Sequence, residues 1–567
     1  MTQTSDKTKL AELLFPNISL TPEMLEEKYP PRPLKEGAKV TRLGPSPTGF
    51  IHLGNLYGAF VDERLAHQSE GVFFLRIEDT DDKRYVEGAV ETIIDSLRFF
   101  DINFDEGATK DGDIGEYGDY TQSHRGDIYA AFAKKLVEEG SAYPCFLTEE
   151  EIAEIRKSQE ENKENPGIYG SYSKYREADC DEVKALLDEG KTYVIRLKST
   201  GDPSKGNEPD ERFSIEDAIR GTLEMPRNFQ DTVILKTSGI PTYHFAHVVD
   251  DHLMRTTHVV RGEEWLPSLP IHVELFEKLG WQPPIYCHTA QLMKLGEDGN
   301  KRKLSKRHDP ELSLDYYRKK GYHPEAVREY LLTILNSNFE EWRKDNQDAD
   351  IDEFKFTTEK MSNSGALFDL DKLNDVSKDV MLRIPAGEIS VFLEEWSKEF
   401  KPEVQGIFGD KEYLSKILDL GRQDAKPRKD LVYAEQIVEF ISYFFDDLYA
   451  GEVDLNIDEP LYPKEDFPAE VDPSDVPVIL TRYLETYNHS DDQSQWFDKI
   501  REIATELGYA AKPKDFKKGP EKYKGHVGHV STVIRVALMG RSQSPDVHSI
   551  QQILGEETVR ARISKYI

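Results

Sequence analysis

A histidine followed by small residues stands where a short apolar segment gives way to a segment of helical periodicity. The stretch 44–55 reads GPSPTGFIHLGN. The first N–H groups of a helix and its dipole attract phosphate. His52 can donate a hydrogen bond to a phosphate oxygen, and Gly54 leaves room for a nucleotide against the backbone. The pattern indicates a phosphate site, although an ordinary capped helix is compatible with it.

A second segment is basic and lies more than 240 positions downstream. Residues 303–307 read KLSKR and follow the Gly-bearing stretch GEDGNKR at 296–302. Lysines on such a loop can neutralise the charge that develops on a leaving pyrophosphate. An arginine can bind phosphate through two parallel hydrogen bonds. Taken alone, the segment fits a solvated basic loop equally well.

The elements around the first segment predict a parallel α/β unit. An apolar strand at 40–43, a helix at 55–68 that ends before Gly71, and a second apolar strand at 72–77 form a βαβ pattern with a right-handed crossover. Ligands of such sheets bind at the carboxyl ends of the strands, which is where His52 falls. Further predicted elements are strands at 232–236 and 258–261 and a helix at 270–279. From about residue 322 onward the pattern is helical.

Length and composition exclude several classes of protein. The chain has 567 residues, enough for several domains. It has no run near 18 apolar residues and its N-terminus lacks a signal-peptide pattern, so we expect no membrane association and a cytoplasmic location. Three scattered cysteines in 567 residues do not form a disulfide framework and fit a reducing compartment.

The net charge is −33, which by itself argues against a polyanionic partner. The charge is unevenly distributed, however. Residues 501–567 contain 12 Lys and Arg against 7 Asp and Glu, so this segment carries +5 and the preceding residues carry −38. Net charge therefore does not decide the partner.

In this order, the two segments resemble the HIGH motif and the KMSKS loop of the class I aminoacyl-tRNA synthetases. Asn55 occupies the fourth position of the first motif, a variation of the glutamyl branch. The resemblance to the bacterial-type glutamyl branch extends from about residue 39 to the end of the chain. It rests on PSPTG at 45–49, LRIEDTD at 75–81, YTQS at 120–123, PTYHFAHVVDDH at 241–252, VRGEEWL at 260–266, LFDLDKL at 367–373 and RVALMGR at 535–541.

This resemblance implies a doubly wound, Rossmann-like α/β catalytic domain with an inserted α/β domain that binds the acceptor end of tRNA, followed by an all-α anticodon-binding region. The expected boundaries are an N-terminal helical arm at 1–38, the first half of the catalytic domain at 39–105, the inserted domain at 106–228, the second catalytic half with the KMSKS-like loop at 229–310, a helical stem-contact domain at 311–374, and the anticodon-binding region at 375–567, with a linker at about 457–477.

The resemblance also implies an activity, namely ATP-dependent activation of L-glutamate to glutamyl-adenylate and its transfer to the 3′-terminal adenosine of tRNA(Glu). The implied catalytic residues are His52, Lys303 and Lys306. The implied ATP-binding residues are Gly54, Asn55, Ser305, Lys306 and Arg307. The implied glutamate-binding residues are Arg42 for the side-chain carboxylate, Glu78 for the ammonium group, and Ser46, Tyr243 and Arg261 for the remaining contacts.

Expectations for metals and RNA follow from the same resemblance. Mg²⁺ would arrive with ATP and not in a dedicated protein site. Many members carry zinc on a Cys-x-Cys pair, but this chain has Cys145 without that partner and a distant Cys180, so we predict no zinc. The residues expected to contact the tRNA backbone are Lys512, Lys514, Lys517, Lys518, Lys522 and Lys524.

Two other functions stay open at this point. An adenylyltransferase of another class would share the His-x-Gly motif, but the long helical C-terminal region argues against it. A non-catalytic tRNA-binding protein would not need His52, Lys303 and Lys306 intact. We expect a monomer, and the sequence leaves open whether tRNA(Gln) is also charged.

Overall fold

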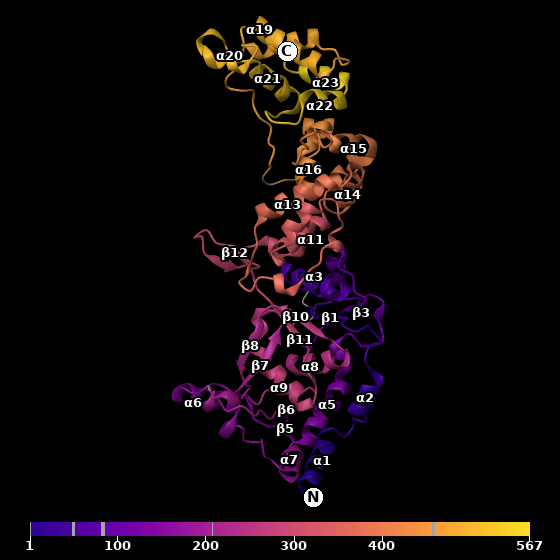
Figure 1. Cartoon of the computed structure of the whole chain (residues 1–567), viewed down its shortest axis with the longest axis vertical. Coiled ribbons are helices and arrows are strands. Elements are labelled where there is room, and N and C mark those ends of the chain that lie inside the picture. The colour runs from indigo at the N-terminus through magenta and orange to yellow at the C-terminus, as the bar shows by residue number, and fades with distance from the viewer. Residues whose placement is uncertain (1, 48–50, 81–85, 207, 456, 458–459) are drawn as a thin grey trace. The chain divides into compact units, whose positions relative to one another are not determined.

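The computed structural model describes residues 2–47, 51–80, 86–206, 208–455, 457 and 460–567 (Figure 1). Thr48, Gly49 and Phe50 of the turn before His52, and Asp81 of the LRIEDTD block, lie outside the described residues. The chain divides into two compact units. The first comprises residues up to 316 together with 331–369, and the second comprises 317–330 with 370–567.

A parallel βαβ unit opens the first compact unit. Strand β1 (Val40–Leu43) pairs in parallel with β2 (Val72–Leu75), and helix α3 (Leu53–His67) connects them. The predicted parallel pair is therefore confirmed, with both strands and the helix within a few residues of their predicted bounds. Strand β3 (Glu106–Thr109) continues the sheet in parallel beside β2, and β4 (Gly112–Ile114) closes it antiparallel.

Gly71 stands where the chain enters β2. Its N–H group donates to the carbonyl of Ala66 at 2.9 Å, just after the end of α3. A Cβ atom at this position would lie 1.8 Å from the carbonyl oxygen of Lys39. Only glycine therefore allows β2 to start so close to the residue before β1.

The second half of the catalytic sheet adjoins β1. Strand β10 (His258–Gly262) pairs in parallel with β11 (Ile285–Thr289), and β7 (Arg212–Asp217) pairs in parallel with β11. Strand β8 (Gly221–Pro226) is antiparallel to β7. The N–H group of Thr257, directly before β10, donates to the carbonyl of Val40 at 2.9 Å. The strands β3, β2, β1, β10 and β11 therefore follow one another across the unit, as in a doubly wound α/β fold.

Smaller sheets and helices complete this unit. Strand β9 pairs antiparallel with β6, outside the parallel sheet. Strand β12 pairs antiparallel with β13 and parallel with β14. The remaining strands are β5 (Ala142–Cys145), β6 (Val194–Leu197), β9 (Val233–Leu235), β12 (Leu292–Leu295), β13 (Lys301–Lys303) and β14 (Ala366–Leu367). The remaining helices are α4 (Ala89–Phe99), α5 (Gly126–Glu139), α6 (Glu149–Asn162), α7 (Cys180–Asp188), α8 (Tyr243–Leu253), α9 (Leu269–Leu279), α10 (Leu314–Lys320, which crosses into the second unit) and α12 (Phe339–Asp345).

The N-terminal segment contains α1 (Thr2–Leu14) and α2 (Pro22–Lys28). Helix α1 packs on α5 and α7. After α2, Arg32 donates two hydrogen bonds to the carboxylate of Glu106, at 2.8 and 3.0 Å. The arm is thus attached to the edge of the catalytic sheet by a two-bond ion pair at β3.

The second unit is helical throughout the part that the structure describes. Its large apolar core contains residues from nearly every helix, including Trp396, Ile437, Ile500 and Val533. Its helices are α11 (Pro324–Leu335, which crosses into the first unit), α13 (Leu370–Arg383), α14 (Ala386–Phe400), α15 (Lys411–Asp419), α16 (Ala434–Ile441), α17 (Asp446–Ala450), α18 (Asp475–Thr486), α19 (Gln493–Glu506), α20 (Pro513–Lys518), α21 (Val527–Met539), α22 (Val547–Leu554) and α23 (Glu556–Ser564). Across the described residues, every helix is too short or too polar to span a membrane.

Candidate active site

One cavity of about 470 Å³ lies at the carboxyl ends of β1, β10 and β11, beside the start of α3. It brings together nine of the residues singled out in the sequence, from both halves of the sheet. These are Arg42, Ser46, His52, Gly54, Asn55, Glu78, Tyr243, Arg261 and Lys303. Ser305, Lys306 and Arg307 are not among the lining residues, and Lys306 and Arg307 are exposed.

His52 caps the N-terminus of α3. Its Nδ1 accepts a hydrogen bond from the backbone N–H of Asn55 at 3.3 Å, and the Asn55 side chain accepts from the backbone N–H of His52 at 3.1 Å. Burial lowers the pKa of His52, as does the nearby Lys303. Because Nδ1 is an acceptor, the neutral ring carries its proton on Nε2, which is therefore a donor.

Two glycines lie so close to functional side chains that a Cβ atom at either position would press against them. A Cβ atom on Gly54 would lie 3.0 Å from the His52 ring, and one on Gly44 would lie 2.3 Å from Oε1 of Glu78. The sequence suggested that Gly54 makes room for a nucleotide. The structure gives a further reason, since the residue also makes room for the imidazole itself.

A buried cluster of charges forms the floor of the cavity. Arg76 donates from Nη1 to Oδ1 of Asp251 at 2.7 Å and from Nη2 to Oε1 of Glu78 at 2.8 Å. Nε of Arg42 lies 3.3 Å from the same Oδ1 of Asp251. Burial alone would raise the pKa of Asp251, but Arg76 and Arg42 together hold it well below its usual range. One carboxylate on α8 therefore binds two arginines from adjacent strands.

The pKa values of two further carboxyl groups at the cavity are raised and not lowered. Burial raises the pKa of Glu78 despite its pair with Arg76. Burial also raises the pKa of Asp62 well above its usual value, and both of its oxygens are buried without a hydrogen-bond partner among the described residues. This end of the cavity therefore combines buried carboxyl groups with the guanidinium groups of Arg42 and Arg261.

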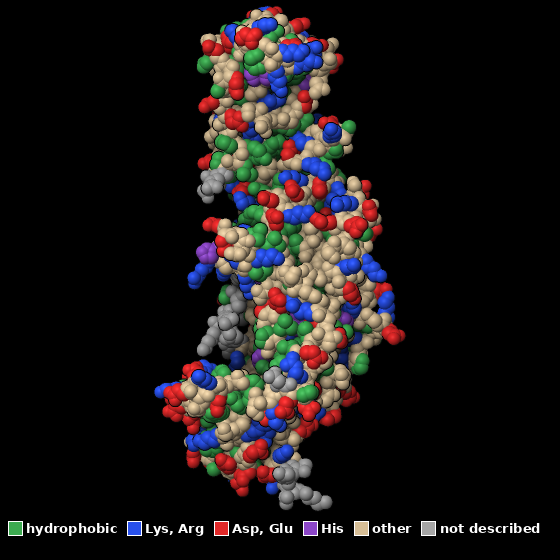
Figure 2. Space-filling view, turned by 60° about the vertical axis from the view of Figure 1, so that its left-hand side comes forward, with side chains coloured by type: hydrophobic (Ala, Val, Ile, Leu, Met, Phe, Trp, Pro, Cys, Tyr) green, Lys and Arg blue, Asp and Glu red, His purple; other side chains and the backbone are tan. Residues whose placement is uncertain are grey.

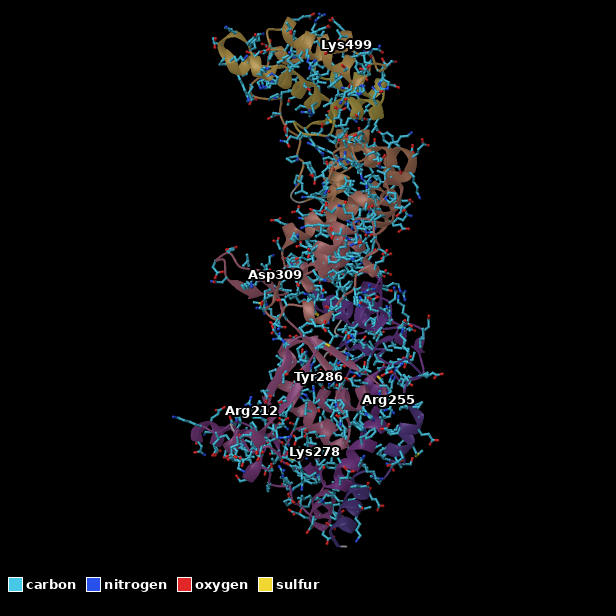
Figure 3. The ribbon with its side chains drawn as sticks, in the orientation of Figure 1. Arg212, Arg255, Lys278, Tyr286, Asp309 and Lys499 are labelled. Atoms are coloured by element: carbon cyan, nitrogen blue, oxygen red, sulfur yellow. The ribbon has the colours of Figure 1, made fainter. Side chains whose placement is uncertain are left out.

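Arg261 lies near the end of β10, the strand next to the one that carries Arg42. Its Nε donates to Nε2 of His288 at 2.9 Å, and its Nη1 donates to Nδ1 of His272 at 3.0 Å. Its carbon Cζ lies 4.6 Å above the ring of Tyr286, which Figure 3 labels within the catalytic sheet. This guanidinium is thus held on three sides by buried rings.

The basic loop has one rigid attachment point, Asp309 (Figure 3). Its carboxylate accepts two hydrogen bonds from Arg302, at 2.6 and 2.7 Å, and one from the N–H of Ser305 at 2.8 Å. The hydrogen bonds from Arg302 lower the pKa of Asp309 well below its usual range. Lys303, at the end of β13, is thereby directed to the cavity wall, while Lys306 lies beyond the turn.

Sequence reasoning missed several residues that complete the site. Arg76 and Asp251 lie inside recognised blocks, and a charged residue in an otherwise apolar strand such as VFFLRI was a usable signal for the first of them. His272, His288 and Asp217 carried no such signal. Cys145 is buried at the end of β5, and Cys180 begins α7.

A second cavity, of about 570 Å³, lies within the C-terminal helices. Its wall includes Trp496 and Phe497 of α19 and Arg535 of α21. Nε of Arg535 is buried without a hydrogen-bond partner in the described part of the chain. The six lysines singled out between 512 and 524 are all exposed, and Lys524 pairs with Asp475 at 2.9 Å. Figure 2 shows Lys and Arg side chains close together on the visible face of this C-terminal part.

Comparisons with known proteins agree with this arrangement. A family described as tRNA synthetases class I (E and Q), catalytic domain, matches residues 39–375, and one described as an anticodon binding domain matches residues 398–567. The glutamate–tRNA ligase of Acetivibrio thermocellus is 61% identical, over 99% of this chain and 100% of that protein. That of Clostridium perfringens strain 13 is 48% identical, over 98% and 99%. A solved glutamate tRNA ligase from Elizabethkingia meningosepticum, in complex with its amino acid, is 28% identical with a TM-score of 0.72, over 93% of this chain and 99% of that one.

We predict that Asp251→Asn lowers the free energy of unfolding by about 3–5 kcal/mol, because it removes the carboxylate that two buried guanidinium groups share. Asp95→Asn, which removes an exposed pair with Lys110, should change it by less than about 1 kcal/mol. Denaturant titration of both variants checks this. Equal effects would contradict the role assigned to Asp251.

The same cluster predicts a pH dependence. The folded-state pKa of Asp251 is depressed, so its contribution to stability is complete above its unfolded pKa of about 4 and is lost as the pH falls toward the folded value. The difference in stability between the wild type and Asp251→Asn should therefore be constant between about pH 6 and 8 and shrink below about pH 4.

Proposed function

The chain belongs to the class I tRNA synthetases for glutamate and glutamine, and from this membership we propose how its cavity acts. Its activity is that of a glutamate–tRNA ligase, which uses ATP to join L-glutamate to tRNA. In the first step an α-carboxylate oxygen of glutamate attacks the α-phosphorus of ATP, and the bond to pyrophosphate breaks. In the second, a ribose hydroxyl of the terminal adenosine attacks the glutamyl carbonyl, and AMP leaves.

The observation that carries this proposal is the pair of buried arginines on one cavity wall. Arg42 and Arg261 lie at the ends of adjacent strands β1 and β10, and both line the same cavity. Asp251 is shared between Arg42 and Arg76, and the second arginine of the wall, Arg261, is held by the neutral rings of His288 and His272. A guanidinium binds a carboxylate through charge-assisted hydrogen bonds. We assign this wall to the side-chain carboxylate of glutamate, with Glu78, Ser46 and Tyr243 for its remaining groups.

The opposite end of the cavity suits the phosphates of ATP. The N-terminus of α3 presents backbone N–H groups, and His52 offers Nε2–H as a neutral donor. Lys303 adds a positive charge from the basic loop. We assign Gly54, Asn55, Ser305, Lys306 and Arg307 to the same nucleotide. Mg²⁺, bound by the ATP phosphates, would neutralise part of their charge.

We assign the C-terminal helices to the anticodon. Unpaired RNA bases stack on aromatic rings and are read by arginine. The cavity formed by Trp496, Phe497 and Arg535 offers both, and Nε of Arg535 is a buried donor without a partner among the described atoms. The exposed lysines at 512, 514, 517, 518, 522 and 524 would attract the RNA backbone.

The central test is ATP–pyrophosphate exchange, with tRNA present, for glutamate, glutamine and no amino acid. We expect exchange with glutamate alone, because the amide of glutamine offers no charge to Arg42 and Arg261. Equal exchange with glutamine would contradict the specificity. Absence of exchange with any amino acid would favour a non-catalytic tRNA-binding protein.

Lys303→Ala and Lys306→Ala should each slow adenylate formation by about 10²–10³-fold while the KM for glutamate changes little, since these charges act on the phosphates. Lys301→Ala, on the same strand β13 and exposed, is the matched control and should resemble the wild type. Pyrophosphate exchange measures all three. A parallel loss of glutamate affinity would mean that the loop only maintains the fold.

Arg535→Ala should raise the KM for tRNA at least tenfold and leave the KM values for glutamate and ATP unchanged, because the C-terminal cavity contacts only RNA in this proposal. Lys565→Ala removes an exposed cation directly after α23, away from the residues that line this cavity, and serves as the control. Aminoacylation at varied tRNA concentration distinguishes the two. An unchanged KM for tRNA would exclude Arg535 from anticodon binding.

A further inference from the structure

The guanidinium of Arg261 has one nitrogen that the protein does not use. Its Nε and Nη1 donate to His288 and His272, whereas Nη2 is buried with no hydrogen-bond partner among the described residues. The side chain of Arg261 lines the cavity, but His288 and His272 do not. His288 therefore acts on the cavity through Arg261, and His272 acts through Arg261 and through the ring of Tyr243, which also lines the cavity.

Arginine can only donate hydrogen bonds, and this determines the tautomer of each neighbour. Nε2 of His288 must be an acceptor, so the proton of its neutral ring is on Nδ1. That nitrogen lies 2.7 Å from Oδ2 of Asp217, a carboxylate oxygen that can only accept. Donor and acceptor roles thus agree along the whole path from Asp217 to Arg261.

The same rule applies on the other side of the guanidinium. Nδ1 of His272 must be an acceptor, so Nε2 carries the proton. Nε2 lies 3.0 Å from Nδ1 of His244, which accepts. Burial lowers the pKa values of His272 and His288, and lowers that of His244 to about 4. All three rings are neutral at physiological pH, so the positive charge of this network belongs to Arg261 and the negative charge to Asp217.

Asp217 is the fixed end of this path. Its Oδ1 accepts from the N–H groups of Ile219 and Arg220, both at 2.9 Å, and its Oδ2 also accepts from the N–H of His288 at 3.0 Å. Asp217 ends β7 at the point where that strand pairs with β11. The carboxylate therefore has no freedom to rotate away from His288.

We propose that Asp217, His288 and His272 are positioning residues for substrate selection, which hold Arg261 so that its free Nη2 meets the side-chain carboxylate of glutamate. A guanidinium fixed before binding loses little rotational freedom when the ligand arrives. It also presents a donor that an amide matches less well than a carboxylate. This inference rests on the proposed glutamate–tRNA ligase activity and names how its specificity is maintained.

The first test compares His272→Leu with His272→Asn. Asn can place a side-chain oxygen close to the position of Nδ1 and so keep an acceptor for Arg261, whereas Leu removes it. We expect the KM for glutamate to rise at least tenfold in the Leu variant and less than threefold in the Asn variant, with the KM for ATP and kcat within about twofold of the wild type in both. Equal effects of Leu and Asn, or a matching rise in the KM for ATP, would overturn the proposal.

The second test is Asp217→Asn, which preserves shape. If the Asn nitrogen faces His288, the ring must carry its proton on Nε2, and two donors then face each other at Arg261. If the nitrogen instead faces Ile219 and Arg220, it meets two backbone N–H groups. We expect a raised KM for glutamate and a smaller preference for glutamate over glutamine. An unchanged KM and preference would contradict the proposal, and should this variant fail to fold, the His272 pair decides.

His258→Leu is the matched control, because it removes a histidine from the opposite end of the same strand β10. It should leave the KM for glutamate unchanged. A wild-type enzyme that activates no glutamate would refute the proposed function. A wild type that does so, with all His272 and Asp217 variants unaffected, would refute only the positioning role.

Discussion

The structure of the active site depends on one shared carboxylate. Asp251 projects from α8 and pairs with Arg42 of β1 and with Arg76, which directly follows β2, all three being almost completely buried. Placing such charges away from water costs several kcal/mol per ion unless the geometry of the pair is good. The cluster is therefore stable only when the helix and both strands have the arrangement observed, and it links the first half of the sheet to the second.

This constraint also explains why the cavity favours anions. Asp251 is paired with two arginines, and burial raises the pKa of Asp62 well above its usual value. The histidines around Arg261 are neutral for the same reason. Arg42 and Arg261 face the cavity at one end and the N-terminus of α3 lies at the other, while Glu78 and Glu264 also line it. Burial thus influences the charge of the groups around the cavity as much as the residue composition does.

The two ends of the cavity differ in how they are supported. The arginine end is surrounded by buried side chains with several hydrogen bonds each, which suits discrimination between an acid and an amide. The phosphate end includes a surface hairpin. Arg302 and Ser305 donate hydrogen bonds to the carboxylate of Asp309 there, and the lysines lie in the rest of the loop. Phosphate recognition needs charge more than exact shape, and a surface loop supplies charge while allowing substrates and products to pass.

The sequence by itself determined the local features of this protein. The strand at 40–43, the helix after His52, the helical C-terminal region and the membership of the family follow from short-range periodicity and contiguous motifs, which depend on neighbours along the chain. Only the tertiary structure decided that Arg42 meets Asp251 across 209 positions, that Asp217 and His288 orient Arg261, and that Lys303 and not Lys306 lines the cavity. These pairings depend on which strands adjoin and how deeply each side chain is buried, and neither is encoded in local pattern.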